Sequence, residues 1–337
     1  MNHERLVLPE NYENKLNYLD TELAIKIVKD SFEKRLAHHL NLVRVSAPLF
    51  VRNDSGLNDN LNGVERPVGF DIKDIHSDVE VVHSLAKWKR LALKQYDFEH
   101  YRCIYTEMNA IRRDEELDNL HSVYVDQWDW EKIIEREERT VDTLKETVRA
   151  IVKAIKETEY VLHEHYDELQ RIVQGEVFFI TSQELEDMYP NKSGKEREYL
   201  ICKEKKTVFI MQIGDKLKSG LPHDGRAPDY DDWKLNGDLL VYYPILDCAL
   251  ELSSMGIRVD RESLLDQCTK ANTLDRLEYP FHKALMNDEL PLTMGGGIGQ
   301  SRLCLMMLNK AHIGEVQVST WGADMIEECR KHGIRLL

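Results

Sequence analysis

Four glycines in five positions stand near the C-terminal end of the sequence, in the stretch TMGGGIGQSRL over 293–303. The order Gly295-x-Gly297-x-Gly299-x-x-Arg302 fits neither the dinucleotide-binding pattern G-x-G-x-x-G nor the phosphate loop G-x-x-x-x-G-K-[ST]. One interpretation is a glycine turn before a buried helix. The other is a floor against which a flat base stacks, with Arg302 reaching a phosphate.

A second group of polar residues follows Arg112 in the stretch RRDEELDNLHSVYVDQWDWE, over 112–131. Because alternate residues of a strand share one face, Gln127, Asp129 and Glu131 lie together if this stretch ends in a strand. An arginine keeps its charge and suits a phosphate, whereas carboxylate and amide groups suit the ammonium group of an amino acid. The stretch therefore indicates either a substrate site or a surface hairpin with incidental charges.

A third group is basic and lies in HSLAKWKRL, over 83–91. Lys87, Lys89 and Arg90 stand among apolar and aromatic residues in a sequence that is otherwise acidic. They are candidates for an anion site that binds a substrate carboxylate. Taken alone, the stretch favours the simpler interpretation of a solvated basic helix face.

The stretches HDGRAPDYDDW and NGD, within 223–238, are rich in aspartate. Carboxylate oxygens are hard ligands that fit Mg²⁺ or an ammonium-like cation. A solvated acidic loop explains the composition equally well. The aspartates are Asp224, Asp229, Asp231, Asp232 and Asp238.

The stretch ELSSMGIR, over 251–258, adds a carboxylate and another arginine. Glu251 and Ser253 share a strand face, and Arg258 offers a second phosphate contact. A lone carboxylate together with substrate phosphates is the usual way in which proteins hold Mg²⁺. Together with the groups above, this stretch indicates ATP-dependent activation of a carboxylate, where catalysis consists of positioning and charge stabilisation.

The composition limits the class of protein. The 337 residues are 42% hydrophobic, and their net charge of −15 counts against a large nucleic-acid partner. No apolar run approaches the roughly 20 residues of a membrane span, and the first residues lack the apolar core of a signal peptide, so we expect a cytoplasmic protein. The six cysteines form no C-x-x-C pair, which argues against a thiolate zinc site or a disulfide framework.

The elements that must position these residues follow from periodicity and turn signals. We expect hairpins over 101–130 and 237–257, strands over 41–51 and 206–214, and helices over 20–40, 261–270 and 278–287. We also expect a helical segment over 131–174 and an N-terminal extension over 1–16. The prediction is an α+β fold with a mostly antiparallel sheet flanked by helices, forming a single domain over 1–337.

Three of these segments resemble, in order, the core motifs of class II aminoacyl-tRNA synthetases. They are the helix, strand and proline ending at VSAPLF, the hairpin Arg112–Glu131, and the glycine stretch with Arg302. A closer similarity is to ammonia-dependent asparagine synthetases (aspartate–ammonia ligases), through VVHSLAKWKR, LHSVYVDQWDWE, RAPDYDDW, LNGD, ELSSMGIRVD and GGGIGQSRL. It runs from about residue 17 to the C-terminus.

This resemblance implies a role for each candidate residue. The nucleotide would be held by Arg112, Arg302, Arg258, Ser253, Gly297 and Gly299. Mg²⁺ would be placed by Glu251 and Asp238. The aspartate would be bound by Lys89, Gln127, Asp129, Asp59 and Ser254. Direct roles in catalysis would fall to Arg112, Lys89, Asp59 and Asp231. Our hypothesis is that Asp59 or Asp231 binds ammonium and helps to remove its proton.

The resemblance also implies the reaction, in which ATP, L-aspartate and ammonia give L-asparagine, AMP and pyrophosphate, and it implies a homodimer. A glutamine-dependent synthetase is disfavoured because its glutaminase domain needs a cysteine nucleophile, and the first cysteine here is Cys103. The net charge disfavours a tRNA synthetase. A non-catalytic sensor would be expected to have lost Arg112, Glu251 or Arg302, and all three are present.

Overall fold

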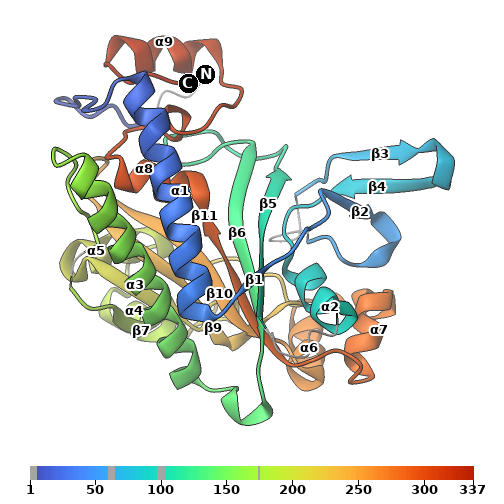
Figure 1. Cartoon of the computed structure of the whole chain (residues 1–337). Coiled ribbons are helices and arrows are strands. Elements are labelled where there is room, and N and C mark those ends of the chain that lie inside the picture. The colour runs from blue at the N-terminus through green and yellow to red at the C-terminus, as the bar shows by residue number, and fades with distance from the viewer. Residues whose placement is uncertain (1–5, 60–64, 97–102, 174) are drawn as a thin grey trace.

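The fold centres on one large, mostly antiparallel sheet. The computed structural model describes residues 6–59, 65–96, 103–173 and 175–337. Within them, eight strands pair in the order β1-β5-β6-β11-β10-β9-β8-β7 (Figure 1). They are β1 (Val43–Arg44), β5 (Cys103–Ile111), β6 (Tyr124–Ile133), β11 (Thr293–Gly299), β10 (Cys248–Arg258), β9 (Asp231–Tyr243), β8 (Thr207–Met211) and β7 (Phe178–Thr181).

The antiparallel character follows from the two hairpins, because strands joined by a short loop must reverse direction. β5 pairs with β6 and β9 pairs with β10, as the sequence predicts, and β11 lies between the two hairpins. Only the edge pairs β1–β5 and β7–β8 are parallel among the described strands. The expected α+β fold with a mostly antiparallel sheet is confirmed.

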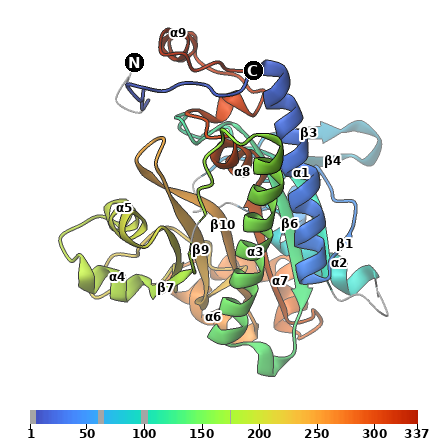
Figure 2. The same cartoon turned by 60° about the vertical axis from the view of Figure 1, so that its left-hand side comes forward.

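Two long helices cover one face of the sheet, as Figures 1 and 2 show. They are α1 (Tyr18–Leu40) and α3 (Val141–His165). Phe32 of α1 packs on Trp128 of β6 with ring centroids 4.8 Å apart, and Trp130 is fully buried in the same core. Since alternate residues of β6 point the other way, this packing leaves Gln127 and Asp129 on the opposite face of the sheet.

The remaining elements surround the ends of the sheet (Figure 1). A small second sheet has the order β2-β4-β3. Its strands are β2 (Phe50–Arg52), β4 (Ser77–Val81) and β3 (Gly69–Ile72). The other helices are α2 (Ala86–Tyr96), α4 (Ser182–Met188), α5 (Gly194–Lys205), α6 (Arg261–Lys270), α7 (Pro280–Met286), α8 (Gln300–Met307) and α9 (Ala323–Lys331). Short 3-10 turns are η2 (Asn53–Ser55), η3 (Lys73–Ile75), η4 (Arg136–Glu138), η5 (Leu274–Glu278) and η6 (Ile313–Glu315).

Two predicted elements are wrong in extent. The strand expected over 41–51 is interrupted, because Pro48 has no N–H to donate to a sheet, and its two halves join different sheets as β1 and β2. The helical segment expected over 131–174 is shorter. β6 continues to Ile133, which pairs with Thr293 of β11, and α3 starts only after its N-cap Thr140.

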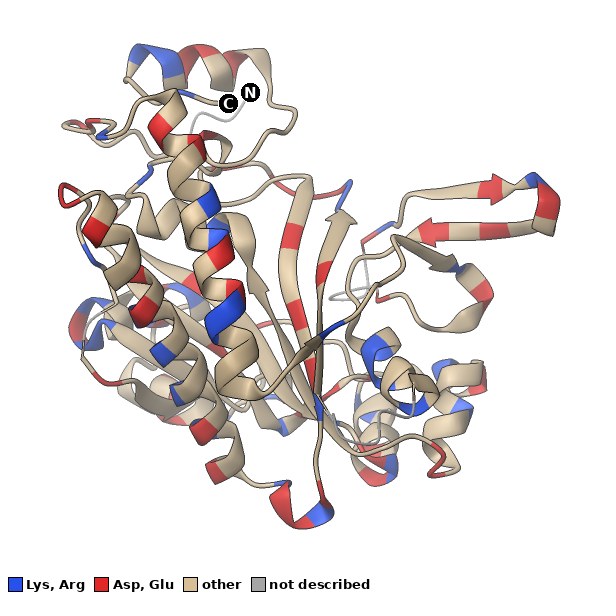
Figure 3. Cartoon of the chain, in the orientation of Figure 1, with Lys and Arg blue, Asp and Glu red and all other residues tan. Residues whose placement is uncertain are grey.

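Charged residues of both signs are interspersed along the helices and strands (Figure 3). Within the described ranges, no helix combines the length and apolarity that a membrane crossing requires.

A buried carboxylate on α3 predicts a pH-dependent stability. Burial raises the pKa of Glu159 to about 7, although the N–H groups of Ile172 (2.8 Å) and Val173 (3.2 Å) favour its ionised form. Between the unfolded pKa and about 7 the folded state binds more protons, so this group costs stability as pH rises. We expect Glu159→Gln, which keeps the acceptor oxygen, to raise the free energy of unfolding by about 2–3 kcal/mol at pH 8 and little at pH 5.

Urea unfolding at both pH values measures this difference, with Glu164→Gln on an exposed position of the same helix as the matched control. Equal changes at pH 5 and pH 8 would show that Glu159 is ionised in the folded protein throughout.

Candidate active site

A cavity of about 450 Å³ is lined by Gln127 and Asp129, whose side chains lie on the face of the sheet opposite α1 and α3. Its walls come from α2, β6, β10, β11, the loop between β5 and β6, and the loop before β9. The structure brings together thirteen of the fourteen predicted site residues here: Asp59, Lys89, Arg112, Gln127, Asp129, Asp231, Glu251, Ser253, Ser254, Arg258, Gly297, Gly299 and Arg302. Asp238 is the exception, and it accepts a hydrogen bond of 2.6 Å from Arg226, which does line the cavity.

The glycine cluster lies in strand β11, so the glycine-turn interpretation is wrong. Its neighbours on β6 explain the missing side chains, because Gly295 pairs with Glu131 and Gly297 with Asp129. A Cβ atom on Gly295 would lie 1.9 Å from Oε2 of Glu131, and one on Gly297 would lie 2.5 Å from both Oδ1 of Asp129 and Oε1 of Gln127. At these two positions β6 side chains cover the strand, and the contact of a base with the glycines stays a prediction.

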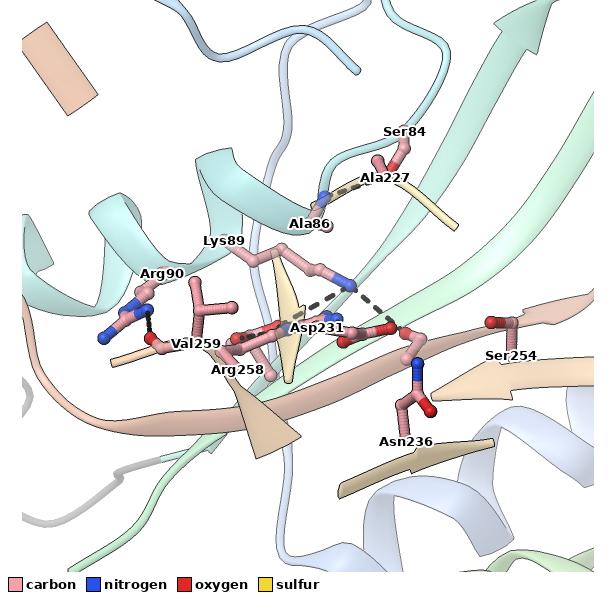
Figure 4. Close-up of polar contacts among 12 residues, drawn as sticks. Ser84, Ala86, Lys89, Arg90, Ala227, Asp231, Asn236, Ser254, Arg258 and Val259 are labelled. Atoms are coloured by element: carbon pink, nitrogen blue, oxygen red, sulfur yellow. Dashed lines mark hydrogen bonds and ion pairs between the residues drawn. The ribbon is translucent and has the colours of Figure 1, made fainter. Parts of the chain in front are cut away.

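The basic stretch of α2 is buried, so its interpretation as a solvated helix face is wrong. Lys89 donates from Nζ to the carbonyl oxygens of Trp130 (3.0 Å) and Gly296 (3.1 Å) and lies 3.3 Å from the carboxylate of Asp129. Burial lowers the pKa of Lys89, and the nearby carboxylates only partly offset this. Figure 4 shows Lys89 reaching from its helix toward the strands.

The two other cations of this stretch hold neighbouring elements together. Arg90 donates to the carbonyl oxygens of Pro291 (2.8 Å) and Val259 (2.6 Å; Figure 4). Lys87 forms an ion pair of 2.8 Å with Asp229. Lys89 alone of the three lines the cavity.

Arg258 is held by two buried carboxylates. Its Nε and Nη2 bind Glu131 at 3.0 and 2.8 Å, and its Nη1 binds Asp231 at 2.5 Å. Burial would raise the pKa of Glu131, but Arg258 and Lys89 outweigh it and lower this pKa. Two carboxylates therefore neutralise this guanidinium, and the phosphate contact of Arg258 stays a prediction.

Other parts of the cavity lining bring cations close to Glu251. Nη1 of Arg302 donates to the carbonyl oxygen of Glu251 at 3.2 Å and lies 3.9 Å from its carboxylate. Burial opposes ionisation of Glu251, but Arg302, Lys195 and Arg226 together lower its pKa. Nε of Arg112 is buried and has no hydrogen-bond partner within the described part of the chain. Arg112, Arg302, Lys195 and Arg226, all of which line the cavity, are here called its anion-binding end.

Two cations of this end were missed by the sequence analysis. Arg226 donates to Asp238 (2.6 Å) and to Oγ of Ser254 (2.5 Å), and Lys195 of α5 pairs with Asp224 at 3.3 Å. The signal for Arg226 was its place as the arginine of the acidic RAPDYDDW block. Lys195 carried no signal, since it lies in a charged helix far from any motif.

The carboxylates of Glu251 and Asp238 lie close enough to affect each other's ionisation. Burial raises the pKa of Asp238 to about 6, with Glu251 adding to the rise and Arg226 opposing it. A buried acid, Asp238, and a half-buried acid, Glu251, beside cations that suit phosphates fit a divalent cation that arrives with a nucleotide. Among the described residues, no group of three or more His, Cys, Asp or Glu side chains forms a complete protein-only metal site.

The acidic stretch 223–238 is neither a solvated loop nor one metal site. Asp229 is buried against Lys87, Arg276 (3.1 Å) and His282 (2.8 Å), away from the cavity. Asp232 pairs with Arg139 at 2.8 Å. Its acids are therefore distributed among separate ion pairs, and Asp231 and Asp224 line the cavity.

Comparison with known proteins agrees with this geometry. The model of the aspartate-ammonia ligase family matches residues 19–333. The chain is 62% identical over 333 residues to the aspartate–ammonia ligase of Ruminiclostridium cellulolyticum, covering 98% of this chain and 99% of that protein. It is 60% identical over 335 residues to that of Clostridium perfringens, covering 99% of this chain and 100% of that protein.

Among solved structures, the asparaginyl-tRNA synthetase from Pyrococcus horikoshii, complexed with asparaginyl-adenylate, is similar with a TM-score of 0.64 at 13% identity, over 88% of this chain and 68% of that one. The aspartyl-tRNA synthetase from Entamoeba histolytica is similar with a TM-score of 0.58 at 14% identity, over 90% of this chain and 59% of that one. These likenesses confirm the class II synthetase fold. On the sequence matches over nearly its whole length, the chain belongs to the aspartate–ammonia ligase family.

Proposed function

We propose that this cavity converts L-aspartate, ammonia and ATP to L-asparagine, AMP and pyrophosphate through a β-aspartyl-adenylate. The observation that carries the proposal is that two kinds of polar group line one cavity. One set is Arg112, Arg302 and Glu251, and the other is Lys89 and Asp129. The first suits a triphosphate and the second suits a zwitterionic amino acid.

The nucleotide belongs at the anion-binding end. Arg112 and Arg302 bind its phosphates, with Arg226 as a further cation near the same wall. Glu251 and Asp238 would hold Mg²⁺, which when bound offsets negative charge on the phosphate oxygens. Ser253 and Gly299 line the wall beside Arg302 and complete the nucleotide contacts.

The aspartate belongs beside the other set, which is here called the aspartate end. Asp129 and Gln127 accept hydrogen bonds from its ammonium group, and Ser254 adds a polar contact. Lys89 pairs with its α-carboxylate, which requires one of the three present contacts of Nζ to be replaced, most simply the 3.3 Å pair with Asp129. In this arrangement Arg258 keeps Glu131 and Asp231 in place.

The reaction then needs no protein nucleophile. An oxygen of the β-carboxylate attacks the α-phosphorus while the bond from that phosphorus to pyrophosphate breaks, and Arg112 offsets the charge that develops on the phosphoryl oxygens. In the second step the nitrogen of ammonia attacks the β-carbonyl carbon and the bond to AMP breaks. Ammonium must lose one proton before this attack, and Asp59 or Asp231 would bind it and accept that proton.

Replacing Asp59 by asparagine tests whether this acid acts in the second step and not in the first. We expect Asp59→Asn to lower asparagine formation about 10²-fold and pyrophosphate–ATP exchange by less than about threefold, because only the second step needs the proton acceptor. Asp231 is a poorer test, since its removal leaves Arg258 partly unpaired in a buried site. Asp54→Asn, in the exposed turn η2, is the control, and equal losses in both assays would contradict the assignment.

The direct test of the function is pyrophosphate release with Mg-ATP and L-aspartate, measured with and without ammonium chloride, while asparagine and AMP are measured in the same samples. We expect ammonium-stimulated release with matching amounts of all three products. Release only on addition of tRNA would instead identify a tRNA synthetase, and no release in the presence of substrate binding would identify a sensor.

Two further parts of the proposal concern the assembly and its location. A homodimer is supported by exposed apolar residues at the start of α1, where Tyr18, Leu19 and Leu23 are 53%, 68% and 47% exposed. Sedimentation equilibrium of the protein and of Leu19→Lys tests it. A cytoplasmic location remains the expectation from the sequence.

A further inference from the structure

The chain over Leu6–Leu16, here called the N-terminal strap, crosses two segments that build the cavity. One is the loop 112–123, which contributes Leu120, His121 and Ser122 to the wall. The other is the segment 309–317, which contributes Ile313 and Gln317. The strap itself does not line the cavity, so any effect on the site must pass through these two segments.

Asn119 joins the strap to both segments. The N–H of Val7 donates to Oδ1 of Asn119 at 2.8 Å, and Nδ2 of Asn119 donates back to the carbonyl oxygen of Val7 at 2.8 Å. The same Nδ2 donates to the carbonyl oxygen of Ala311 at 2.7 Å. The N–H of Ile313 donates to the backbone carbonyl oxygen of Asn119 at 2.8 Å. Asn119 is 3% exposed, so water cannot replace these partners without opening the wall.

Glu315 makes the second connection. The hydroxyl of Tyr12 donates to its two carboxylate oxygens at 2.8 and 3.0 Å, and Nδ2 of Asn14 donates at 3.2 Å. The N–H groups of Ala311 and His312 donate to the same carboxylate at 2.9 and 3.1 Å. Glu315 is 1% exposed, so the strap supplies partners that a buried carboxylate needs.

Lys310 is a buried cation that also binds the strap. Its Nζ donates to Oδ1 of Asn14 at 2.6 Å and to Oγ1 of Thr21 at 3.0 Å, and it is also 1% exposed. Two buried ionisable residues of the segment 309–317 therefore depend on Asn14 of the strap. Hydrogen bonds to charged groups are stronger than those between neutral groups, so these contacts fix the strap firmly.

Both connected segments border the anion-binding end. The loop 112–123 begins at Arg112, and Gln317 donates from Nε2 to Oγ of Ser301 at 2.9 Å, next to Arg302 in the chain. The aspartate end is anchored differently, because Lys89 and Asp129 are fixed by α2 and the strands. The two ends of the cavity thus rest on different supports.

We propose that the N-terminal strap is a positioning element for the nucleotide end of the cavity, acting through Asn119 and Glu315. This inference rests on the assignment of ATP to Arg112 and Arg302 under the proposed function. Loosening the strap weakens nucleotide binding and leaves aspartate binding almost unchanged.

Strap variants that leave the wall residues intact test this. Val7→Pro removes the N–H that Asn119 accepts, and Tyr12→Phe removes the hydroxyl bound to Glu315. We expect the double variant to raise KM for ATP, and the Kd of α,β-methylene-ATP measured by calorimetry, by about 5- to 30-fold, with KM for aspartate within about twofold. Hydrogen exchange of the amides over 117–123 is expected to accelerate.

Lys15→Ala is the matched control, because Lys15 binds the carbonyl oxygen of Glu168, at 2.6 Å and away from the cavity. It is expected to leave both KM values unchanged. A parallel rise in KM for ATP and aspartate in the double variant, or a lower Tm with both values unchanged, would assign the strap to stability alone. Failure of the unaltered protein to bind the analogue would instead remove the nucleotide assignment itself, and the inference with it.

Discussion

Gly295→Ala is expected to lower asparagine formation by about 10²- to 10³-fold and to destabilise the protein by about 3–5 kcal/mol, the cost of disrupting a buried ion pair. The new Cβ would lie 1.9 Å from Oε2 of Glu131 and 2.5 Å from Nη2 of Arg258. Neither side chain has room to retreat, because both are buried and bound to each other. The displacement would also disturb Lys89, which lies 3.8 Å from the Glu131 carboxylate.

The measurement is the steady-state rate with urea unfolding of the same preparation. Gly322→Ala is the control, since a Cβ there meets no heavy atom within 4 Å among the described residues, and we expect wild-type activity. Should Gly295→Ala not yield folded protein, Gly297→Ala offers a second test with a contact of 2.5 Å to two side-chain oxygens. Wild-type activity in either glycine variant would show that β6 side chains do not occupy the space above β11.

Arg112→Ala is expected to reduce adenylate formation by about 10²- to 10³-fold, the usual loss when one preorganised donor to a developing charge is removed. Arg112→Lys keeps the charge but loses the planar fork that binds two phosphate oxygens, so we expect it to recover only part of the rate. The backbone would be undisturbed, because the N–H of Arg112 donates to Val123 whatever its side chain is.

Pyrophosphate–ATP exchange in the absence of ammonia isolates this step. Arg113→Ala is the matched control, since Arg113 is the adjacent, exposed arginine and does not line the cavity. The assignment of Arg112 to the phosphates fails if Arg112→Ala retains normal exchange while only asparagine formation is lost.

The local parts of the fold were predictable from sequence. The hairpin of β5 and β6 and that of β9 and β10 lie where alternating apolar residues and a polar loop place them. The errors occur where a distant segment decides the outcome. β6 extends through Ile133 because Thr293 of β11, 160 positions later in the chain, pairs with it. The periodicity of residues 131–140 gives no information about that partner.

The same distinction between local and distant determinants applies to the candidate site. Motif residues such as Arg112, Gln127 and Glu251 were found because their types and spacing point to phosphate, amide and metal chemistry, and they do meet in one cavity. Arg226 and Lys195 were missed, since a single cation in a charged stretch looks like a solvated one until its neighbours are known.

The hairpins, the family and the set of candidate site residues could be predicted from the sequence, because they depend on residue type and spacing along the chain. Which charges neutralise each other could not be predicted in this way. Arg258 is bound by Glu131 and Asp231, which lie 127 and 27 positions away in sequence. The glycines of β11 are a second example, because the side chains of the neighbouring strand β6 leave no room for a Cβ atom at Gly295 and Gly297. An ion pair or a steric contact depends on distances of a few ångströms between separate elements, and these distances exist only once the sheet has formed.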